Sequence, residues 1–317
     1  MKKRILVVSS ANLDFVQRMR RVPRAGETVT ESATYSYVPG GKGANSAVTF
    51  ARLGDDCVFC TRLGADANGN RLLSVYEKEG IDTRFILRDK KVPTGLASIL
   101  VEEDGANRII VYPGANNAIT VPDVEDALTC YPDAVYLQFE IPDKATLAAA
   151  RFAHEKNIPV FVDAGPARVD FPLSELGRME IFSPNETEAK VYTGIDPNGA
   201  DNCLRAAIKL STMVDAKYIV IKIGSRGAFI YDGKYYHIVP AISVPAVDTT
   251  AAGDTFTAAL VHFYMQGMDI ERATYLANCA AAIGVSREGA YTSIPTLKEV
   301  LAFAEEHPQR CGSKERL

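Results

Sequence analysis

Short apolar runs alternate with longer segments of helical periodicity along most of the chain. The runs at 5–9, 58–63, 134–137, 159–162, 181–183 and 218–223 predict buried strands, and the segments 42–53, 71–79, 144–157, 186–193 and 204–214 predict helices. Glycine directly follows two of these helical segments, at Gly54 and Gly80, as is common at helix ends. The alternation predicts an α/β fold of three layers, in which helices flank a mostly parallel central sheet.

Two stretches break this alternation and predict a small antiparallel sheet. Residues 28–38 alternate polar and apolar side chains, and the strand-like residues 95–102 and 107–112 flank Asp104-Gly105, a strong hairpin signal. Such a sheet is too small to stand alone, so it must cover a ligand, pair with the same sheet of a second subunit, or do both. We expect both. The chain is then a single domain, 1–317, with a β lid built from about 12–38 and 93–114 that also joins two subunits into a homodimer.

Composition favours chemistry on small molecules. Of the 317 residues, 47% are apolar and 23% charged, with a net charge of -4 and no block of basic residues, so we expect neither nucleic acid nor a membrane as a partner. The apolar run that follows the basic residues 2–4 is too short for a signal peptide or a membrane span. The six cysteines lack framework spacing, which indicates reduced thiols in the cytoplasm. Cys57 and Cys60 form C-x-x-C, but residues three apart in a strand face opposite sides, so we expect no metal or redox site there.

Residues 247–256 form a turn of small residues that runs into a strongly apolar, helical stretch. Backbone NH groups at a helix start have no intrahelical partners and carry the positive end of the helix dipole, so they bind phosphate or developing negative charge. Asp254 would lie beside that anion, where it can accept a proton from an attacking hydroxyl. Taken alone, the segment fits an ordinary helix N-terminus equally well, because Asp is favoured there. The first hypothesis is phosphoryl transfer to an alcohol.

The glycine-rich residues 40–45 would let the backbone approach a ligand closely. They match neither the Walker A pattern nor the dinucleotide-binding G-x-G-x-x-G pattern, so they do not by themselves indicate a nucleotide. Lys42 and Asn45 offer donors for a polyhydroxylated substrate, and Asn12 and Asp14, after the first strand, offer an amide and an acceptor. Turn chemistry alone also explains Asn12 and Asp14.

Three later segments suit a nucleotide. Residues 185–188 predict a helix N-cap followed by acidic residues, which would also hold Mg²⁺ through water beside phosphates. Residues 224–227 close a strand and could wrap a phosphate or ribose, although a tight turn explains them better locally. Alanine and glycine crowd residues 276–285, which indicates close helix packing and can leave room for an adenine ring.

Together these motifs resemble the ribokinase family of carbohydrate kinases, also called the PfkB family, over essentially the whole chain. The two family signatures are residues 40–45 with the helix that follows and residues 248–256, and further matches lie at 12–14, 113–116, 137–140 and 184–188. The resemblance implies a ribokinase-like fold and ATP-dependent phosphorylation of the primary hydroxyl of a pentose, with D-ribose going to D-ribose 5-phosphate. Deoxyribose, fructose, a keto-deoxy sugar acid and a nucleoside are the alternative substrates. Intact Gly253 and Asp254 argue against a silent sensor on the same scaffold.

The resemblance also implies roles for individual residues. Asp254 is the base, and the backbone of Ala251, Ala252, Gly253 and Asp254 forms the anion hole. Sugar contacts are implied for Asn12, Asp14, Gly40, Gly41, Lys42, Asn45, Glu140 and Asp254. Nucleotide contacts are implied for Asn185, Gly224, Ser225, Gly227, Gly253 and Asn278, with Glu188 near Mg²⁺ through water. We expect Lys222 to contact the nucleotide as well, although it is not part of the family pattern. A monovalent cation, usually K⁺, is implied at Asp248, Thr250, Gly284, Arg287, Gly289 and Ser293, several of them through backbone carbonyls.

Two positions depart from the pattern that the resemblance implies. Residues 163–167 read Asp-Ala-Gly-Pro-Ala where the family has Asn-Pro-Ala-Pro-Ala, and Lys222 stands where threonine is common. The first departure lies at the end of a central strand and bears on which sugar is bound. The second either adds a phosphate contact or projects into solvent.

Overall fold

The structure is a computed structural model that describes residues 2–30, 34–103, 106–308 and 315–316. The predicted hairpin turn at Asp104-Gly105, part of the alternating segment 28–38 and Cys311 lie outside the described residues. Within the described ranges, no helix combines the length and the apolar character that crossing a bilayer requires.

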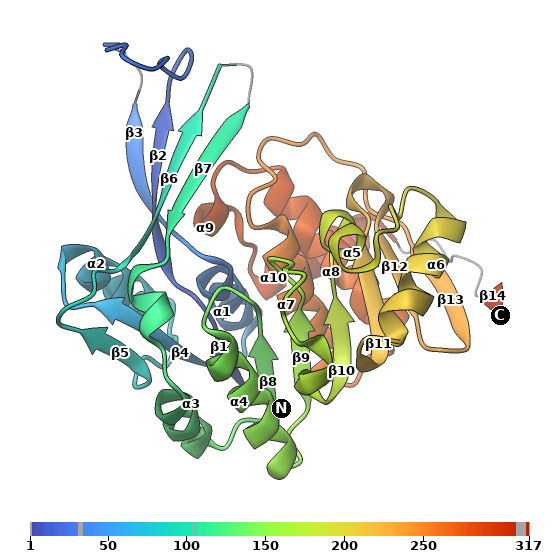
Figure 1. The fold of residues 1–317 in the computed structure, drawn as a ribbon. Helices are drawn as coiled ribbons and strands as arrows, with labels where there is room; N and C mark the ends of the chain where they lie inside the picture. The colour runs from blue at the N-terminus through green and yellow to red at the C-terminus, as the bar shows by residue number, and fades with distance from the viewer. Residues whose placement is uncertain (1, 31–33, 104–105, 309–314, 317) are drawn as a thin grey trace.

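Ten strands of the described chain form one sheet, in the order β14-β13-β12-β11-β10-β9-β8-β1-β4-β5 (Figure 1). The parallel strands are β1 (Arg4–Val8), β4 (Asp56–Gly64), β5 (Ile86–Asp89), β8 (Ala134–Leu137), β9 (Val160–Asp163), β10 (Arg178–Ser183) and β11 (Asp215–Lys222). The antiparallel edge consists of β12 (Ala228–Tyr231), β13 (Tyr235–Val239) and β14 (Glu315–Arg316). The predicted mostly parallel sheet is therefore confirmed.

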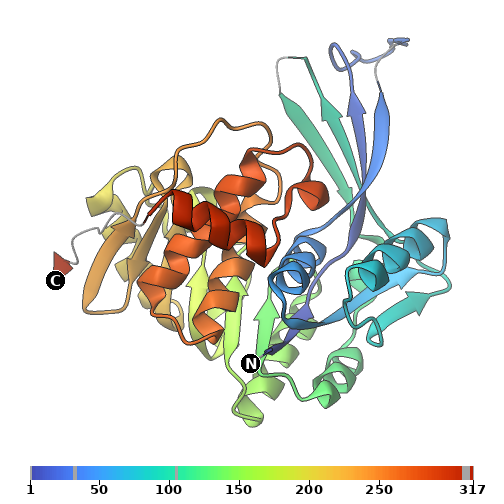
Figure 2. The ribbon, with the colours of Figure 1, turned by 180° about the vertical axis from the view of Figure 1, so that it is seen from behind.

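Helices cover both faces of this sheet and make three layers (Figures 1 and 2). One face carries α1 (Lys42–Leu53), α2 (Ala67–Lys78), α7 (Ala252–Met265), α8 (Ile270–Val285) and α10 (Leu297–Glu306). The other carries α3 (Val121–Ala127), α4 (Asp143–Glu155), α5 (Glu186–Thr193) and α6 (Ala200–Ser211). The short elements are α9 (Ala290–Ser293) and the 3₁₀ turns η1 (Gly114–Ala118), η2 (Leu128–Cys130), η3 (Leu173–Leu176) and η4 (Gly224–Arg226).

Two apolar cores lie between these layers because successive strand residues face opposite sides of the sheet. Ile5 and Val7 point into the core under α1, α7 and α8, whereas Leu6 and Val8 point into the core under α3 to α6. Cys57 and Cys60 separate in the same way, one into each core. Burial raises the thiol pKa of both cysteines. The C-x-x-C pattern is thus two packing residues on opposite faces of one strand.

A second sheet of four strands projects from the body, in the order β3-β2-β6-β7 (Figures 1 and 2). Its strands are β2 (Asn12–Arg18), β3 (Tyr35–Gly40), β6 (Gly95–Val101) and β7 (Asn107–Tyr112). The β2–β3 and β6–β7 pairs are antiparallel, but β2 and β6 run parallel. Both follow parallel strands of the main sheet, β1 and β5, and therefore leave the same edge in the same direction. Asn12 and Asp14 thus lie in a strand, not in the turn that is the alternative to a ligand role.

Candidate active site

Helix α7 begins with a left-handed residue. Ala251, its N-cap, has φ 61° and ψ 2°, a conformation that costs a residue with a Cβ about 1–2 kcal/mol and that concentrates at ligand sites. Thr255 N donates the first α-helical bond to Ala251 O at 2.8 Å, and Ala252 N donates to Thr249 O at 3.3 Å. The amides of Gly253 and Asp254 lie between these two bonds, at the positive end of the helix dipole. The two amides of this turn can therefore receive an anion.

Asp254 is buried in the first turn of α7 and held by two residues of the glycine-rich segment. Its Oδ2 accepts a hydrogen bond from Asn45 Nδ2 at 2.9 Å, and its Oδ1 lies 3.4 Å from Lys42 Nζ. Burial raises the pKa of Asp254 to about 6, against the opposing attraction of Lys42. The charge of Asp254 in turn raises the pKa of Lys42. A carboxyl group that titrates near neutrality and is ionised at pH 7 is suited to accept a proton.

Two glycines let the second sheet, α1 and the end of β1 meet without a gap. A Cβ on Gly40, at the end of β3, would overlap the Asp14 carboxylate. Gly41 caps α1 with φ 90°, and a Cβ there would lie 2.8 Å from the backbone nitrogen of Asn12. At Gly40 the close approach excludes a Cβ, and at Gly41 both the close approach and the positive φ require glycine. This packing places Lys42 and Asn45 opposite Asp254.

Asn12 contributes its side-chain amide to the cleft, by which we mean the hollow between the second sheet and the body of the molecule that contains Asp254. Asn12 Oδ1 accepts a hydrogen bond from Asn116 Nδ2 at 2.8 Å, and Asn116 Oδ1 accepts one from Ala11 N at 2.9 Å. Because the Asn12 oxygen accepts this bond inside the protein, the Nδ2 group is the part that can serve a ligand as a donor. Asn116 belongs to η1, which follows β7, so it links the segment that leaves the second sheet to the segment that enters it at β2.

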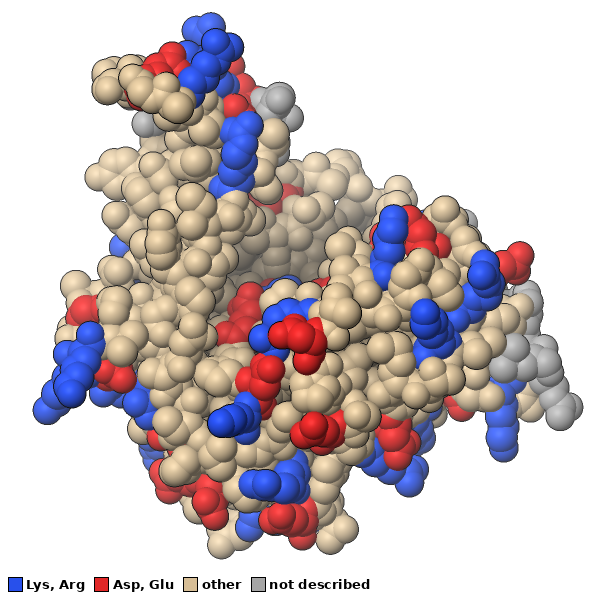
Figure 3. Space-filling model, in the orientation of Figure 1, with Lys and Arg blue, Asp and Glu red and all other residues tan. Residues whose placement is uncertain are grey.

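Two further carboxylates face the same space. Glu140 Oε2 accepts hydrogen bonds from Ser10 Oγ and, at 3.1 Å, from the backbone nitrogen of Lys42. Burial raises the pKa of Asp14 to about 7, with further contributions from the negative charges of Glu140 and Asp254. Three carboxyl groups and one ammonium therefore converge here. Figure 3 shows acidic and basic side chains together in the hollow between the second sheet and the body.

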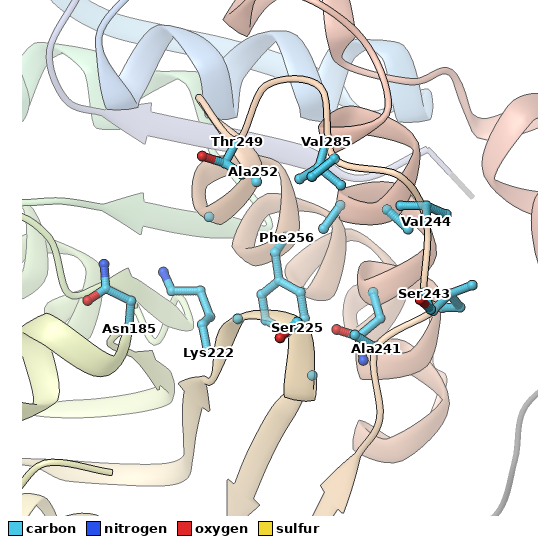
Figure 4. Close-up of a pocket in the computed structure, with 18 of the residues that line it drawn as sticks. Asn185, Lys222, Ser225, Ala241, Ser243, Val244, Thr249, Ala252, Phe256 and Val285 are labelled. Atoms are coloured by element: carbon cyan, nitrogen blue, oxygen red, sulfur yellow. The ribbon is translucent and has the colours of Figure 1, made fainter. Parts of the chain in front are cut away.

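A second cavity, of about 530 Å³, lies on the other side of the α7 start (Figure 4). Its lining includes every residue that was predicted to contact a nucleotide: Asn185, Lys222, Gly224, Ser225, Gly227, Gly253 and Asn278. Glu186, Thr187, Thr249 and Ala252 also line it. The remaining wall is largely apolar and is made by Ala241, Ile242, Ser243, Val244, Ala246, Phe256 and the α8 residues Ala281, Ala282 and Val285. Asn278 Nδ2 donates to the carbonyls of Val239 and Pro240, both at 3.1 Å, and so holds the loop that forms this wall.

Glu188 lies where the two cavities approach each other. It forms a capping box with Asn185 at the start of α5: Asn185 N donates to Glu188 Oε2 at 2.7 Å and Glu188 N donates to Asn185 Oδ1 at 2.8 Å. The other carboxylate oxygen, Oε1, lies on the side of Gly165 and Lys42. In the described part of the chain, no three His, Cys, Asp or Glu side chains are grouped to hold a metal by themselves. Mg²⁺ that is bound mainly by water and substrate phosphates needs only one or two carboxylates, and Glu188 fits that requirement.

The residues predicted to hold a monovalent cation come from two loops that Asp248 joins. Asp248 Oδ1 accepts hydrogen bonds from Thr250 N at 2.9 Å and Thr250 Oγ1 at 2.6 Å, and Asp248 Oδ2 accepts one from Gly289 N at 3.1 Å. Ser293 and Gly284 are buried beside them, and the Arg287 side chain pairs with Glu299 at 2.6 Å. Their side chains are thus engaged within the protein, so the backbone carbonyls of these loops are the oxygens that fit a cation.

The two departures from the family pattern meet in the structure. Lys222 does not project into solvent: its Nζ forms a buried ion pair with Asp163 Oδ1 and donates to Thr257 Oγ1 at 3.1 Å. Gln138 Nε2 donates to the other Asp163 oxygen, Oδ2, at 2.9 Å.

Sequence reasoning missed several residues around the site. Asn116, Ser10, Gln138 and Thr257 hold site side chains in place, and the apolar residues 241–244 line the second cavity. Asn116 had a usable signal, because residues 113–116 match the resemblance. Gln138 had the same signal, because it lies in the matching residues 137–140. Ser10, Thr257 and the apolar residues had none, since their roles depend on contacts with residues far away in the sequence.

Comparison with known proteins gives a family match over most of the chain. The model of the pfkB family carbohydrate kinases matches residues 2–297. A ribokinase of Haemophilus influenzae is 34% identical over 311 residues, which cover 96% of this chain and 99% of that protein. A deoxyribokinase of Salmonella typhi is 30% identical over 299 residues, covering 93% of this chain and 96% of that protein.

Among solved structures, this fold is similar to the ribokinase of Arabidopsis thaliana complexed with ribose and ATP. The TM-score is 0.88 at 32% sequence identity, with 96% of this chain and 99% of that chain covered. The predicted fold class, an α/β architecture with a mostly parallel sheet and a second smaller sheet, is therefore confirmed by an experimentally determined relative.

Proposed function

This chain belongs to the pfkB family of carbohydrate kinases, and from that premise we propose that it transfers the γ-phosphoryl group of ATP to the primary hydroxyl of D-ribose. The products are D-ribose 5-phosphate and ADP. An enzyme of this family is a phosphotransferase with an alcohol as acceptor. The relatives named above that act on ribose, and the one complexed with ribose and ATP, support the choice of both substrates.

One observation carries the proposal: two adjacent residues at the start of α7 face different cavities. Gly253 lines the cavity of about 530 Å³, whereas the Asp254 side chain bonds to Asn45 in the cleft below the second sheet. A nucleotide in the first and a sugar in the second would therefore meet at this peptide. Phosphoryl transfer needs such an in-line encounter between the donor phosphate and the acceptor hydroxyl.

The residues at this junction divide the chemical work. Asp254 accepts the proton of the sugar hydroxyl as its oxygen attacks phosphorus, and Asn45 and Lys42 hold the carboxylate in place. The amides of Gly253 and Asp254 stabilise the negative charge on the transferring oxygens. Asn12, Asp14 and Glu140 bind the other sugar hydroxyls and so fix the reactive one in position.

Two ions complete the proposal. Glu188 would hold Mg²⁺ through water, and the loops around Asp248 would hold a monovalent cation, with K⁺ as the expected ion. When bound, these ions supply positive charge beside the phosphates and the helix start. Removal of Mg²⁺ with a chelator should abolish turnover, and replacement of K⁺ by Na⁺ or Tris should lower kcat without unfolding the protein.

Deoxyribose is the second candidate substrate because a relative of similar identity is a deoxyribokinase. A site whose buried groups hydrogen-bond a hydroxyl can reject the analogue without it by about 10⁴-fold. Measurement of kcat/KM for D-ribose and 2-deoxy-D-ribose separates the two. A ratio well above one supports ribose, and a ratio below one reassigns the enzyme to deoxyribose.

The second sheet supports a further part of the proposal, a homodimer. Strand β7 exposes the apolar side chains of Ile109, Ile110, Val111 and Tyr112, each at least half exposed in the single chain. Contiguous exposed apolar residues of this kind mark interaction surfaces. Sedimentation velocity should give a dimer, and Ile110→Glu should shift it towards monomer.

The enzyme assay tests the proposal as a whole. ADP formation is followed with ATP, Mg²⁺ and K⁺ against D-ribose, 2-deoxy-D-ribose, D-fructose, a keto-deoxy sugar acid and a nucleoside. The expected result is the highest kcat/KM with D-ribose and a product phosphorylated on its primary hydroxyl. Absence of sugar-dependent ADP formation across this panel would reject the proposed function.

A further inference from the structure

Lys222 and Asp163 lie far apart in the sequence and form a buried ion pair in the structure. They lie at the ends of β11 and β9, and both strands flank β10. Their side chains are 11% and 1% exposed, respectively. Replacing one member alone would leave an uncompensated buried charge, which is strongly destabilising. The two residues therefore act as a unit.

The pair lies directly beneath the start of α7. Thr257, which accepts a hydrogen bond from Lys222 Nζ, donates its own Oγ1 proton to the carbonyl of Gly253 at 3.1 Å. A Cβ built on Gly253 would lie 3.8 Å from Lys222 Nζ. Lys222 also lines the second cavity beside Asn185, its partner in an isolated β-bridge (Figure 4). Its ammonium group is thus next to the amides assigned to the transferring phosphoryl group.

The arrangement leaves the ammonium group one further donor. An ammonium group carries three protons, and Asp163 and Thr257 accept two of them. The exposed part of the Lys222 side chain opens into the cavity. The charge of Asp163 also contributes to the raised pKa values of Asp254 and Lys42, so this pair is electrically coupled to the sugar side of the site.

Resting on the proposed function, we infer that Lys222 is a catalytic residue that binds the γ-phosphoryl group of ATP through this third proton. Asp163 is its positioning residue. In the reaction, the sugar hydroxyl oxygen bonds to the γ-phosphorus and the bond to the β–γ bridging oxygen breaks. The hydroxyl proton goes to Asp254, and ADP leaves with the electron pair of the broken bond. Lys222 stabilises the negative charge that is shared by the γ-phosphoryl and bridging oxygens during this exchange.

The alternative is that Lys222 only neutralises Asp163, and a double variant separates the two roles. In Lys222→Met, both the proposed catalytic charge and the partner of Asp163 are lost. In Asp163→Asn/Lys222→Met, no buried carboxylate remains without its partner, so the Tm should return to near the wild-type value. If Lys222 is catalytic, kcat stays about 100-fold or more below wild type in both variants, as for loss of one preorganised donor. Recovery of wild-type kcat in the double variant would overturn the inference.

Two further variants sharpen the result. Lys222→Arg keeps a positive charge and should retain more kcat than Lys222→Met, which a purely space-filling role would not require. Lys217→Met is the matched control, because Lys217 lies on the same strand but pairs with Glu180 at the far surface. That control should leave kcat unchanged.

A binding experiment keeps the inference separate from the proposed function. Calorimetry with ADP and with a non-hydrolysable ATP analogue needs no sugar and no turnover. The double variant should lose affinity for the analogue and keep its affinity for ADP, because only the analogue carries a γ-phosphoryl group. Equal losses for both ligands, or no loss, would contradict the role of Lys222. Wild-type protein that binds the analogue but phosphorylates no sugar would reject the proposed function and leave this binding result intact.

Discussion

The two cavities on either side of the α7 start are built in different ways. The cleft under the second sheet holds side chains that bond to one another before any ligand arrives, such as Asn45 to Asp254 and Asn12 to Asn116. The second cavity is lined mainly by glycines, backbone and apolar residues, with Lys222 as its buried charged group. Fixed hydrogen-bonding groups discriminate strongly between hydroxyl patterns, whereas an apolar wall discriminates weakly. In the proposed function, this contrast assigns specificity for the acceptor to the cleft and delivery of the phosphoryl group to the second cavity.

The largest expected effect lies at the junction of the two cavities. Asp254→Asn keeps the shape of the side chain but removes its basicity, so kcat should fall by at least about 100-fold. Binding of an ATP analogue should persist, because Asp254 faces the cleft. Steady-state kinetics and calorimetry on the same preparation measure both. A kcat within a few-fold of wild type would show that Asp254 is not the base.

A smaller effect is expected from a residue of the cleft. At pH 8, above the raised pKa of Asp14, Asp14→Asn exchanges a charged acceptor for a neutral one, which is worth about 1.5–3 kcal/mol, or roughly 10- to 100-fold in kcat/KM for D-ribose. The KM for ATP should not change. Asp170→Asn, at an exposed aspartate, is the control. If the KM for ATP changed as much as the KM for D-ribose, the proposed division of roles between the two cavities would be contradicted.

The pH dependence of kcat/KM for the sugar should reflect the two carboxyl groups of the cleft that have raised pKa values. Because the pKa of Asp254 is raised to about 6 and that of Asp14 to about 7, both lose their charge as the pH falls through this range. The kcat/KM for the sugar should therefore decline below about pH 7, approaching tenfold per pH unit or more below pH 6. The same protons are bound more tightly by the folded than by the unfolded state, so their contribution to stability falls as pH rises from about 4 to 7. A pH-independent kcat/KM between 5 and 8 would contradict these assignments.

The smallest effect is expected in the second cavity. Asn278→Ala removes the two hydrogen bonds that hold the carbonyls of Val239 and Pro240. At about 1 kcal/mol or less for each, the two bonds contribute about 2 kcal/mol or less, so the KM for ATP should rise about 30-fold or less, with the KM for D-ribose unchanged. A loss of sugar affinity would show that this loop also shapes the cleft.

Local patterns were sufficient for the elements that bury a continuous apolar face. The bounds predicted for α1, α5 and β8 agree with the structure to the residue. Helix α2 starts at Ala67 rather than 71, because the Asp66 carboxylate accepts Gly69 N at 2.8 Å and so caps a turn that contains glycine. Strands β12 and β13 went unpredicted, since their pairing partners decide their conformation more than their own residues do.

The contacts between the site residues could not be predicted from local sequence patterns. The hydrogen bond between Asn45 and Asp254 spans 209 positions, and no periodicity relates the two segments. Their shared role came from the family resemblance. The Asp163–Lys222 pair was predicted neither by a local pattern nor by the resemblance, because each residue departs from the family pattern. Only the structure reveals that the two departures compensate each other.

The stereochemical course at phosphorus distinguishes direct transfer to the sugar from transfer through a phosphorylated protein. Direct transfer across the Gly253–Asp254 junction, with Asp254 as a base, predicts inversion when the γ-phosphoryl group of ATP is made chiral with oxygen isotopes and the sugar phosphate is analysed. Retention would mean that the phosphoryl group first bonds to the protein, and would contradict direct transfer to the sugar.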